Sequence, residues 1–91
     1  MRLVKPTSQF KKSFKRILMS GRFDKEEIQN VIKIIARGEK LDNKFEDHQL
    51  HGKFLGHREC HIRPNLLLLY RIENNNLVLV LADIGSHPGL F

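Results

Sequence analysis

Two apolar runs separated by three asparagines constrain the fold more than any other feature of this sequence. Residues 66–72 read LLLLYRI and residues 77–84 read LVLVLADI, with Asn74, Asn75 and Asn76 between them. Asparagine tolerates the positive φ angles of tight turns, so the two runs are predicted to pair as an antiparallel hairpin. The first run is apolar enough to form a central strand that is buried on both faces.

The N-terminal half carries helical periodicity instead. A short strand predicted at residues 2–5 ends at Pro6, and Thr7 or Ser8 can cap a following helix. Apolar residues then recur at helical spacing in two stretches, which end at Gly21 and Gly38 and predict two helices. These residues are Phe10, Phe14, Ile17 and Leu18 in the first stretch and Ile28, Val31, Ile32 and Ile35 in the second. Asp24 and Glu27 resemble a capping box before the second helix. The pattern is that of an αα-hairpin.

The segment between the helices and the apolar runs is less regular. Residues 40–47 are polar and indicate an extended surface connection, and residues 50–53 and 57–62 are candidates for two short strands. The predicted order is therefore βααβββ. An N-terminal strand and an αα-hairpin that packs on one face of a small antiparallel sheet belong to the α+β class.

Length and charge narrow the class of protein. A chain of 91 residues fills one small core, so a single domain is expected over residues 1–91. A single cysteine, Cys60, permits no internal disulfide, and neither a signal peptide nor the roughly 20 apolar residues of a membrane span is recognisable. We therefore expect a cytoplasmic protein that makes no contact with a membrane.

The net charge of the chain is +6, and it is unevenly distributed: residues 1–22 carry seven basic side chains and no acidic one. This bias predicts an anionic partner such as nucleic acid.

The histidines indicate the chemistry. All five lie in the second half of the chain: His48, His51, His57, His61 and His87. Histidine can accept and donate a proton near neutral pH, so a cluster of histidines could cleave RNA by general acid–base catalysis, with lysine or arginine stabilising the charged phosphate. Taken singly, His51 and His57 are better interpreted as loop or strand-end residues. A zinc site with Cys60 and a catalytic cysteine are alternatives, but no CxxC or HExxH spacing supports a metal site.

Three motifs resemble the YafQ branch of the RelE-like toxins. They are DHQLHG at residues 47–52, RECHIRPNLLLLY at residues 58–70 and GSHPGLF at residues 85–91. The resemblance implies the RelE/ParE-superfamily fold and an endoribonuclease without metal or other cofactor that cuts messenger RNA in the ribosomal A site. It also implies a cognate antitoxin that covers the basic and catalytic surfaces, and the complex of the two could bind operator DNA. By motif position, it makes His48, His61 and His87 catalytic, with His48 and His87 as the acid–base pair in either order.

RNA contacts are expected from three sources. The basic helix, the cations near the histidines and the motif positions together contribute Lys11, Lys12, Lys15, Arg16, Lys53, Arg63, Asn65, Arg71 and Phe91. The ring of Phe91 matches an aromatic residue that stacks on a base.

The chain departs from the family pattern at two positions. Asn65 stands where the family usually has aspartate, and Asp83 stands where it commonly has arginine. An anion at position 83 would repel the scissile phosphate, so either Arg63 or Arg71 substitutes for the arginine or the nuclease is weakened. Two further functions therefore remain open. The first is a weakly active binding module that acts through antitoxin pairing and operator repression, and the second is a gyrase poison on the related ParE fold.

Overall fold

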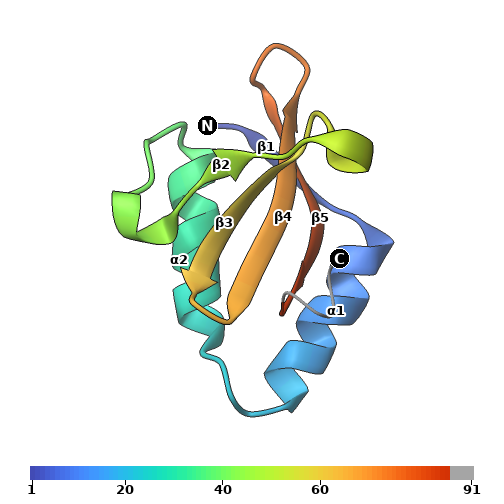
Figure 1. The fold of residues 1–91 in the computed structure, drawn as a ribbon, viewed down its shortest axis with the longest axis vertical. Coiled ribbons are helices and arrows are strands. Elements are labelled where there is room, and N and C mark those ends of the chain that lie inside the picture. The colour runs from blue at the N-terminus through green and yellow to red at the C-terminus, as the bar shows by residue number, and fades with distance from the viewer. Residues whose placement is uncertain (87–91) are drawn as a thin grey trace.

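The computed structural model describes residues 1–86. Its elements, in chain order, are β1 (Leu3–Pro6), α1 (Ser8–Met19), α2 (Lys25–Ala36), a 3₁₀ helix (Asn43–Phe45), β2 (His48–Gln49), a second 3₁₀ helix (Gly52–Phe54), β3 (Arg58–Arg63), β4 (Leu66–Glu73) and β5 (Val78–Gly85). Figure 1 shows α1 and α2 diverging from the loop that connects them, so that each covers a different part of the sheet. No helix within residues 1–86 is long and apolar enough to cross a membrane.

The five strands form one mixed sheet in the order β1-β5-β4-β3-β2. The predicted α+β class is correct, but four strands follow the helices where the predicted order βααβββ has three. The sheet is also not purely antiparallel, because β1 runs parallel to β5. A parallel pair needs a long connection, and here the whole chain between the first and last strands supplies it. The Thr7 backbone N–H and hydroxyl both donate to the Leu81 carbonyl, which fixes the end of β1 against β5.

Side-chain caps begin both helices. The Thr7 hydroxyl accepts a hydrogen bond from the Phe10 N–H, as its place before α1 predicts. The Asp24 carboxylate caps α2 by accepting from the Glu26 N–H. The predicted capping box is wrong in its second half, because the Glu27 carboxylate binds Arg63 of β3 with both oxygens, at 2.8 Å each.

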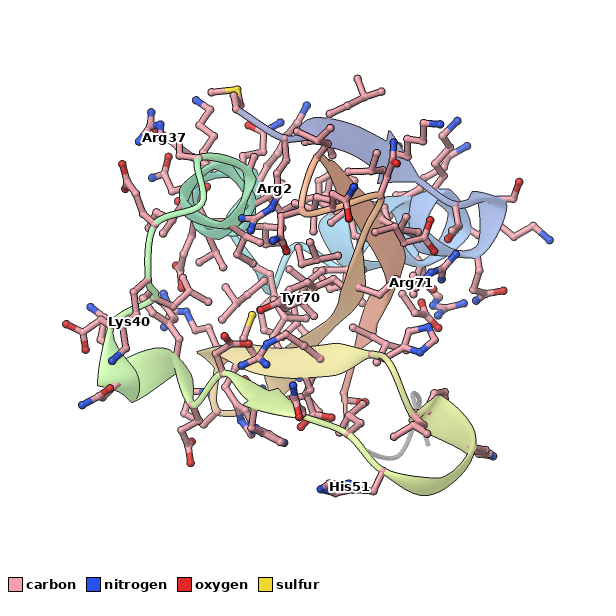
Figure 2. All side chains as sticks on the ribbon, turned by 90° about the horizontal axis from the view of Figure 1, so that it is seen from above. Arg2, Arg37, Lys40, His51, Tyr70 and Arg71 are labelled. Carbon is pink, nitrogen blue, oxygen red and sulfur yellow. The ribbon has the colours of Figure 1, made fainter. Side chains whose placement is uncertain are left out.

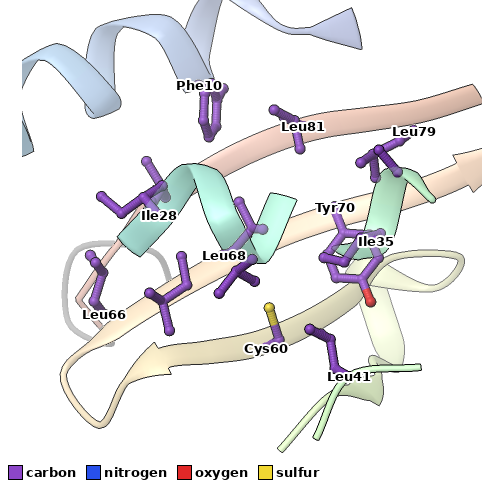
Figure 3. Packing of buried hydrophobic residues seen from close by; sticks show 14 of the residues in the cluster. Phe10, Ile28, Ile35, Leu41, Cys60, Leu66, Leu68, Tyr70, Leu79 and Leu81 are labelled. Atoms are coloured by element: carbon purple, nitrogen blue, oxygen red, sulfur yellow. The ribbon is translucent and has the colours of Figure 1, made fainter. Parts of the chain in front are cut away.

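The core lies between the helices and one face of the sheet. Figure 3 shows Phe10 of α1 and Ile28 and Ile35 of α2 packed over β3, β4 and β5. Leu68 at the centre of β4 is fully buried, as the apolar run predicts. Burial of this apolar area is the main favourable contribution to the free energy of folding.

The hairpin of β4 and β5 forms where it was predicted. Asn74, Asn75 and Asn76 all have positive φ, at 55°, 54° and 69°, and they turn the chain between the two strands. Leu69 pairs with Asp83 and Tyr70 pairs with Leu81, so β5 has one extra residue between these pairs. Such a bulge changes which face the following side chains occupy.

The strand predicted at residues 50–53 is wrong. In the segment before β3, only His48 and Gln49 pair with that strand. The chain then enters a loop that contains the 3₁₀ helix Gly52–Phe54. Gly52 and Gly56 both have positive φ, at 67° and 92°, which turns the backbone away from the sheet on either side of this helix. The loop closes where the Leu50 N–H donates to the His57 carbonyl.

Candidate functional site

Two of the predicted catalytic histidines meet at a buried carboxylate. In β3, side chains alternate between faces, so Glu59 and His61 lie opposite the core residues Cys60 and Ile62. Strand β2 pairs His48 directly with Glu59. One Glu59 oxygen, Oε1, lies 3.6 Å from His48 Nε2 and 3.5 Å from His61 Nε2, and the two imidazole rings are 6.3 Å apart. The Glu59 side chain is only 4% exposed, whereas that of His48 is 48% exposed, so substrate can reach the imidazole but not the carboxylate.

Glu46 holds the same two rings from the opposite side. Its carbonyl lies 2.6 Å from His48 Nδ1, and its carboxylate lies 3.9 Å from His61 Nδ1. A carbonyl oxygen only accepts hydrogen bonds, so Nδ1 of His48 carries a proton and donates it. Nε2 of His48 then faces Glu59. Glu46 follows the 3₁₀ helix Asn43–Phe45 and has a left-handed conformation, with a φ of 49°. This conformation allows Glu46 to lie against both rings.

A hollow of about 520 Å³ opens beside His61, between α2 and the edge of β3. It exists because β2 pairs only with Arg58 and Glu59 and leaves the rest of that edge uncovered. Its lining includes Asn30, Lys44, Phe45, Glu46, His61 and Arg63, and we call it the His61 hollow. The Lys44 ammonium lies 5.2 Å from the centre of the Phe45 ring. The hollow thus combines an imidazole, two cations and an aromatic ring, groups that bind single-stranded RNA, with the carboxylates of Glu27 and Glu46, and Glu27 holds Arg63.

A second hollow, of about 420 Å³, lies at the end of β5. Its lining includes Gln9, Arg16, Arg22, Phe23, Asn65, Asp83 and Ser86, and we call it the Asp83 hollow. The sheet register links the two hollows, because His61 pairs with Leu67 and Leu67 pairs with Gly85. Neighbouring strands are about 4.8 Å apart, so the two hollows flank the same short stretch of sheet. Asp83 shares its hollow with two arginines, Arg16 and Arg22. Its carboxylate accepts a hydrogen bond from the Ile84 N–H at 2.8 Å.

The other predicted RNA contacts are dispersed. Lys11, Lys12, Lys15 and Arg16 are exposed on α1, and Lys53 lies over the Phe54 ring in the loop after β2. Arg63 is held by Glu27. Arg71 binds the Glu73 carboxylate and lies 3.4 Å from His57 Nε2. Neither Arg63 nor Arg71 is among the residues that line the Asp83 hollow.

The two histidines predicted to be non-catalytic lie apart from the Glu59 cluster. Figure 2 shows the exposed His51 on the loop after β2, pointing away from the rest of the molecule. His57 is partly buried at the other end of this loop, against Arg71 and the edge of the Phe54 ring. Its Nδ1 is buried without a hydrogen-bond partner.

Cys60 faces the core instead of the histidines. Burial raises the pKa of its thiol to about 12, so the thiolate needed to bind zinc or attack a substrate is disfavoured. The alternative site built from Cys60 and His61 is therefore wrong, because neighbouring residues of β3 point to opposite faces. Within residues 1–86, no three histidine, cysteine, aspartate or glutamate side chains are grouped closely enough to hold a metal ion. His87 and Phe91 lie outside the described residues.

The residues next to the two histidines that were not predicted are Lys44, Phe45, Glu46 and Glu59. The signal for Glu59 was present, since strand alternation places it on the same face as His61. No comparable signal marks Lys44, Phe45 and Glu46, because their position depends on the 3₁₀ helix and on the left-handed conformation of Glu46.

Comparison with known proteins identifies the family. The family model for YafQ, a bacterial toxin of type II toxin–antitoxin systems, matches residues 2–91. The chain belongs to the YafQ toxin family. In addition, 47 residues, or 52% of the chain, are 32% identical to the mRNA interferase toxin YafQ of Escherichia coli K12. The matched segment spans about half of that relative, 49% of its length.

Solved structures place the whole chain on the YafQ fold. A copper-bound mutant toxin from Helicobacter pylori has a TM-score of 0.93 and 37% identity, with 100% of both chains covered. YafQ from Escherichia coli BL21(DE3) has a TM-score of 0.88 and 22% identity over 100% of this chain and 99% of that one. The Escherichia coli DinJ–YafQ toxin–antitoxin complex gives a TM-score of 0.85 at 23% identity, over 99% of this chain and 97% of that one.

Proposed function

We propose that this YafQ-family toxin is an endoribonuclease that cleaves messenger RNA on the ribosome and thereby inhibits translation. The observation that carries the proposal is the convergence of His48 and His61 on the buried Glu59, beside a hollow lined by Lys44 and Arg63. A buried carboxylate is costly unless positively charged partners compensate it, and these imidazoles are the groups within reach. The arrangement therefore favours a role in proton transfer over one in packing.

The reaction needs a base, an acid and a cation. The base removes the proton from a ribose 2′-hydroxyl, the resulting oxygen attacks the adjacent phosphorus, and the bond to the 5′-oxygen breaks as the acid protonates that oxygen. We assign the two proton transfers to His48 and His87, in either order. His61 and Glu59 lie beside His48, where Glu59 offsets the positive charge that an imidazole gains when it takes a proton.

Arginines from outside the histidine motifs are proposed to bind the phosphates. From the sequence, Arg63 or Arg71 was the candidate to replace the arginine that the family has at position 83. Both engage carboxylates, those of Glu27 and Glu73. Arg16 and Arg22 share the hollow of Asp83 itself, so these two side chains are better placed to offset its charge.

We further propose that a cognate antitoxin neutralises this toxin. YafQ of Escherichia coli forms a toxin–antitoxin complex with DinJ. In the present chain the exposed basic residues of α1 offer a surface for an acidic partner, and the complex of the two proteins would bind operator DNA.

One observation favours the second candidate function, a binding module with little nuclease activity. The carboxylate of Asp83 lines a hollow in which a phosphate would have to approach it. Repulsion there would reduce cleavage while antitoxin pairing and operator repression persist.

Translation-coupled cleavage of a defined message by purified ribosomes tests the proposal. It compares the unaltered protein with His87→Ala and Asp83→Arg, in the presence of a chelator selective for copper and zinc. Ribosome-dependent cuts that survive the chelator and disappear in His87→Ala are expected, and a faster rate in Asp83→Arg would show that Asp83 restrains the nuclease. Absence of cleavage by folded, unaltered protein that still binds ribosomes or antitoxin would leave the binding module as the function.

A further inference from the structure

Three side chains next to the histidine cluster form a hydrogen-bonded group that the reaction does not use directly. Arg58 donates to both oxygens of Asp47, from Nε at 3.3 Å and from Nη2 at 3.1 Å. The Tyr70 hydroxyl donates to Oδ1 of the same carboxylate at 2.5 Å. The three residues come from the chain before β2, from β3 and from β4. We call this group the Asp47 clamp.

The clamp is partly withdrawn from water. The side chains of Arg58 and Asp47 are 31% and 24% exposed, and Tyr70 is almost fully buried. Burial, followed by the hydrogen bond to Asp47, raises the pKa of the Tyr70 hydroxyl, so it remains protonated and able to donate. The hydrogen bond to Asp47 likewise raises the pKa of Arg58. A bidentate arginine–carboxylate pair fixes orientation as well as distance, which a single contact does not.

The clamp lies directly before the shortest strand of the sheet. Strand β2 consists of His48 and Gln49 alone, at the sheet edge, and two residues provide too few backbone hydrogen bonds to hold a strand in place. Adjacent side chains of an extended chain point to opposite faces. When Asp47 points toward Tyr70, His48 must therefore point toward Glu59 and His61.

We propose that Asp47, Arg58 and Tyr70 are positioning residues, which hold the imidazole of His48 against Glu59 and set the geometry of proton transfer. The consequence for cleavage rests on the proposed function, but the position of the ring is a property of the free protein. The observable signature is the approach of His48 Nε2 to the Glu59 carboxylate, which lasts only while β2 stays paired with β3.

Two substitutions remove parts of the clamp with little change of shape. Tyr70→Phe deletes one hydroxyl, and Asp47→Asn replaces one acceptor oxygen and removes the charge. In both, we expect nitrogen NMR to show a changed His48 Nε2 signal as the contact with Glu59 is lost, while amide signals of β4 and β5 report an intact fold. We expect the cleavage rate at saturating ribosome to fall roughly tenfold or more, with little change in KM, because misplacing a catalytic group by about 1 Å is enough to do this.

Two control variants separate positioning from general destabilisation. Glu27→Gln weakens the other bidentate arginine–carboxylate pair of β3 and should leave the His48 spectrum unchanged. Ile28→Val removes one core methylene, which costs about 0.5–1.5 kcal/mol, and should leave both the spectrum and the cleavage rate unchanged.

The outcomes are distinct. An unchanged His48 Nε2 signal in both clamp variants would overturn the proposal, and so would a displaced ring with an unchanged cleavage rate. If the unaltered protein does not cleave RNA, the proposed function fails on that measurement, and the NMR comparison still decides whether the clamp holds the ring.

Discussion

Two neighbouring residues of strand β3, on opposite sides of the sheet, are both buried but are chemically opposite. Cys60 is fully buried among apolar side chains under the helices, and its neighbour Glu59, only 3% exposed, is buried against two imidazoles. An apolar thiol gains by leaving water, whereas a carboxylate loses its hydration and requires compensating partners. One side of the strand therefore stabilises the fold. The other is arranged for proton transfer, and substitutions on the two sides should affect different measurements.

The largest effect is expected from removing His61, on the side of proton transfer. His61→Ala should lower the rate of ribosome-dependent cleavage by about 10²-fold, because losing the ring beside Glu59 misplaces His48, which transfers a proton. The unfolding free energy should fall by only about 1 kcal/mol, because the imidazole is not part of the apolar core and His48 still compensates the buried Glu59 carboxylate. Cleavage kinetics and urea unfolding of the same preparation measure both. A stable variant that retains the full rate would remove His61 from the mechanism.

On the core side, Leu68→Ala should do the reverse. Leu68 pairs with Cys60 and is fully buried, so its truncation should reduce the unfolding free energy by about 2–5 kcal/mol. Urea unfolding monitored by circular dichroism measures the loss. The protein that remains folded should cleave at the normal rate, and a rate that falls as far as in His61→Ala would show that the two sides of the sheet are not independent.

The smallest effect is expected from a rise of one pH unit in the alkaline range. The ordinary pKa of the Cys60 thiol is 9.0, and burial raises it to about 12 in the folded protein. Ionisation above pH 9 therefore favours the unfolded chain, and stability that is complete below this pH should fall by about 1.4 kcal/mol per pH unit until pH 12. Tyr70, whose pKa is also raised above 10.0, should add to the slope at higher pH. Chemical unfolding at several pH values tests this, with Cys60→Ala as the control that should have a shallower slope.

Local patterns predicted those parts of the fold that local physics decides. The start of each helix follows from its capping residue, Thr7 or Asp24. The last hairpin follows from three asparagines that accept positive φ. The strand predicted at residues 50–53 was wrong. The pattern of side chains there resembled that of a strand, but Gly52 and Gly56 turn the backbone out of the sheet. The parallel placement of β1 was missed because no feature near residue 3 specifies which distant strand it joins.

The sequence by itself determined the two helices, the last hairpin, the apolar core and the presence of a histidine-rich half, because these depend on periodicity and composition. Only the tertiary structure decided which histidines meet. The register of His48 against Glu59 and the alternation along β3 bring His48 and His61 together, while the loop after β2 carries His51 away. The tertiary structure also brings Glu27 to Arg63 and Asp47 to Arg58, as ion pairs. These contacts join residues 11 to 36 positions apart, and such distances are closed by packing of the whole chain, which no local pattern encodes.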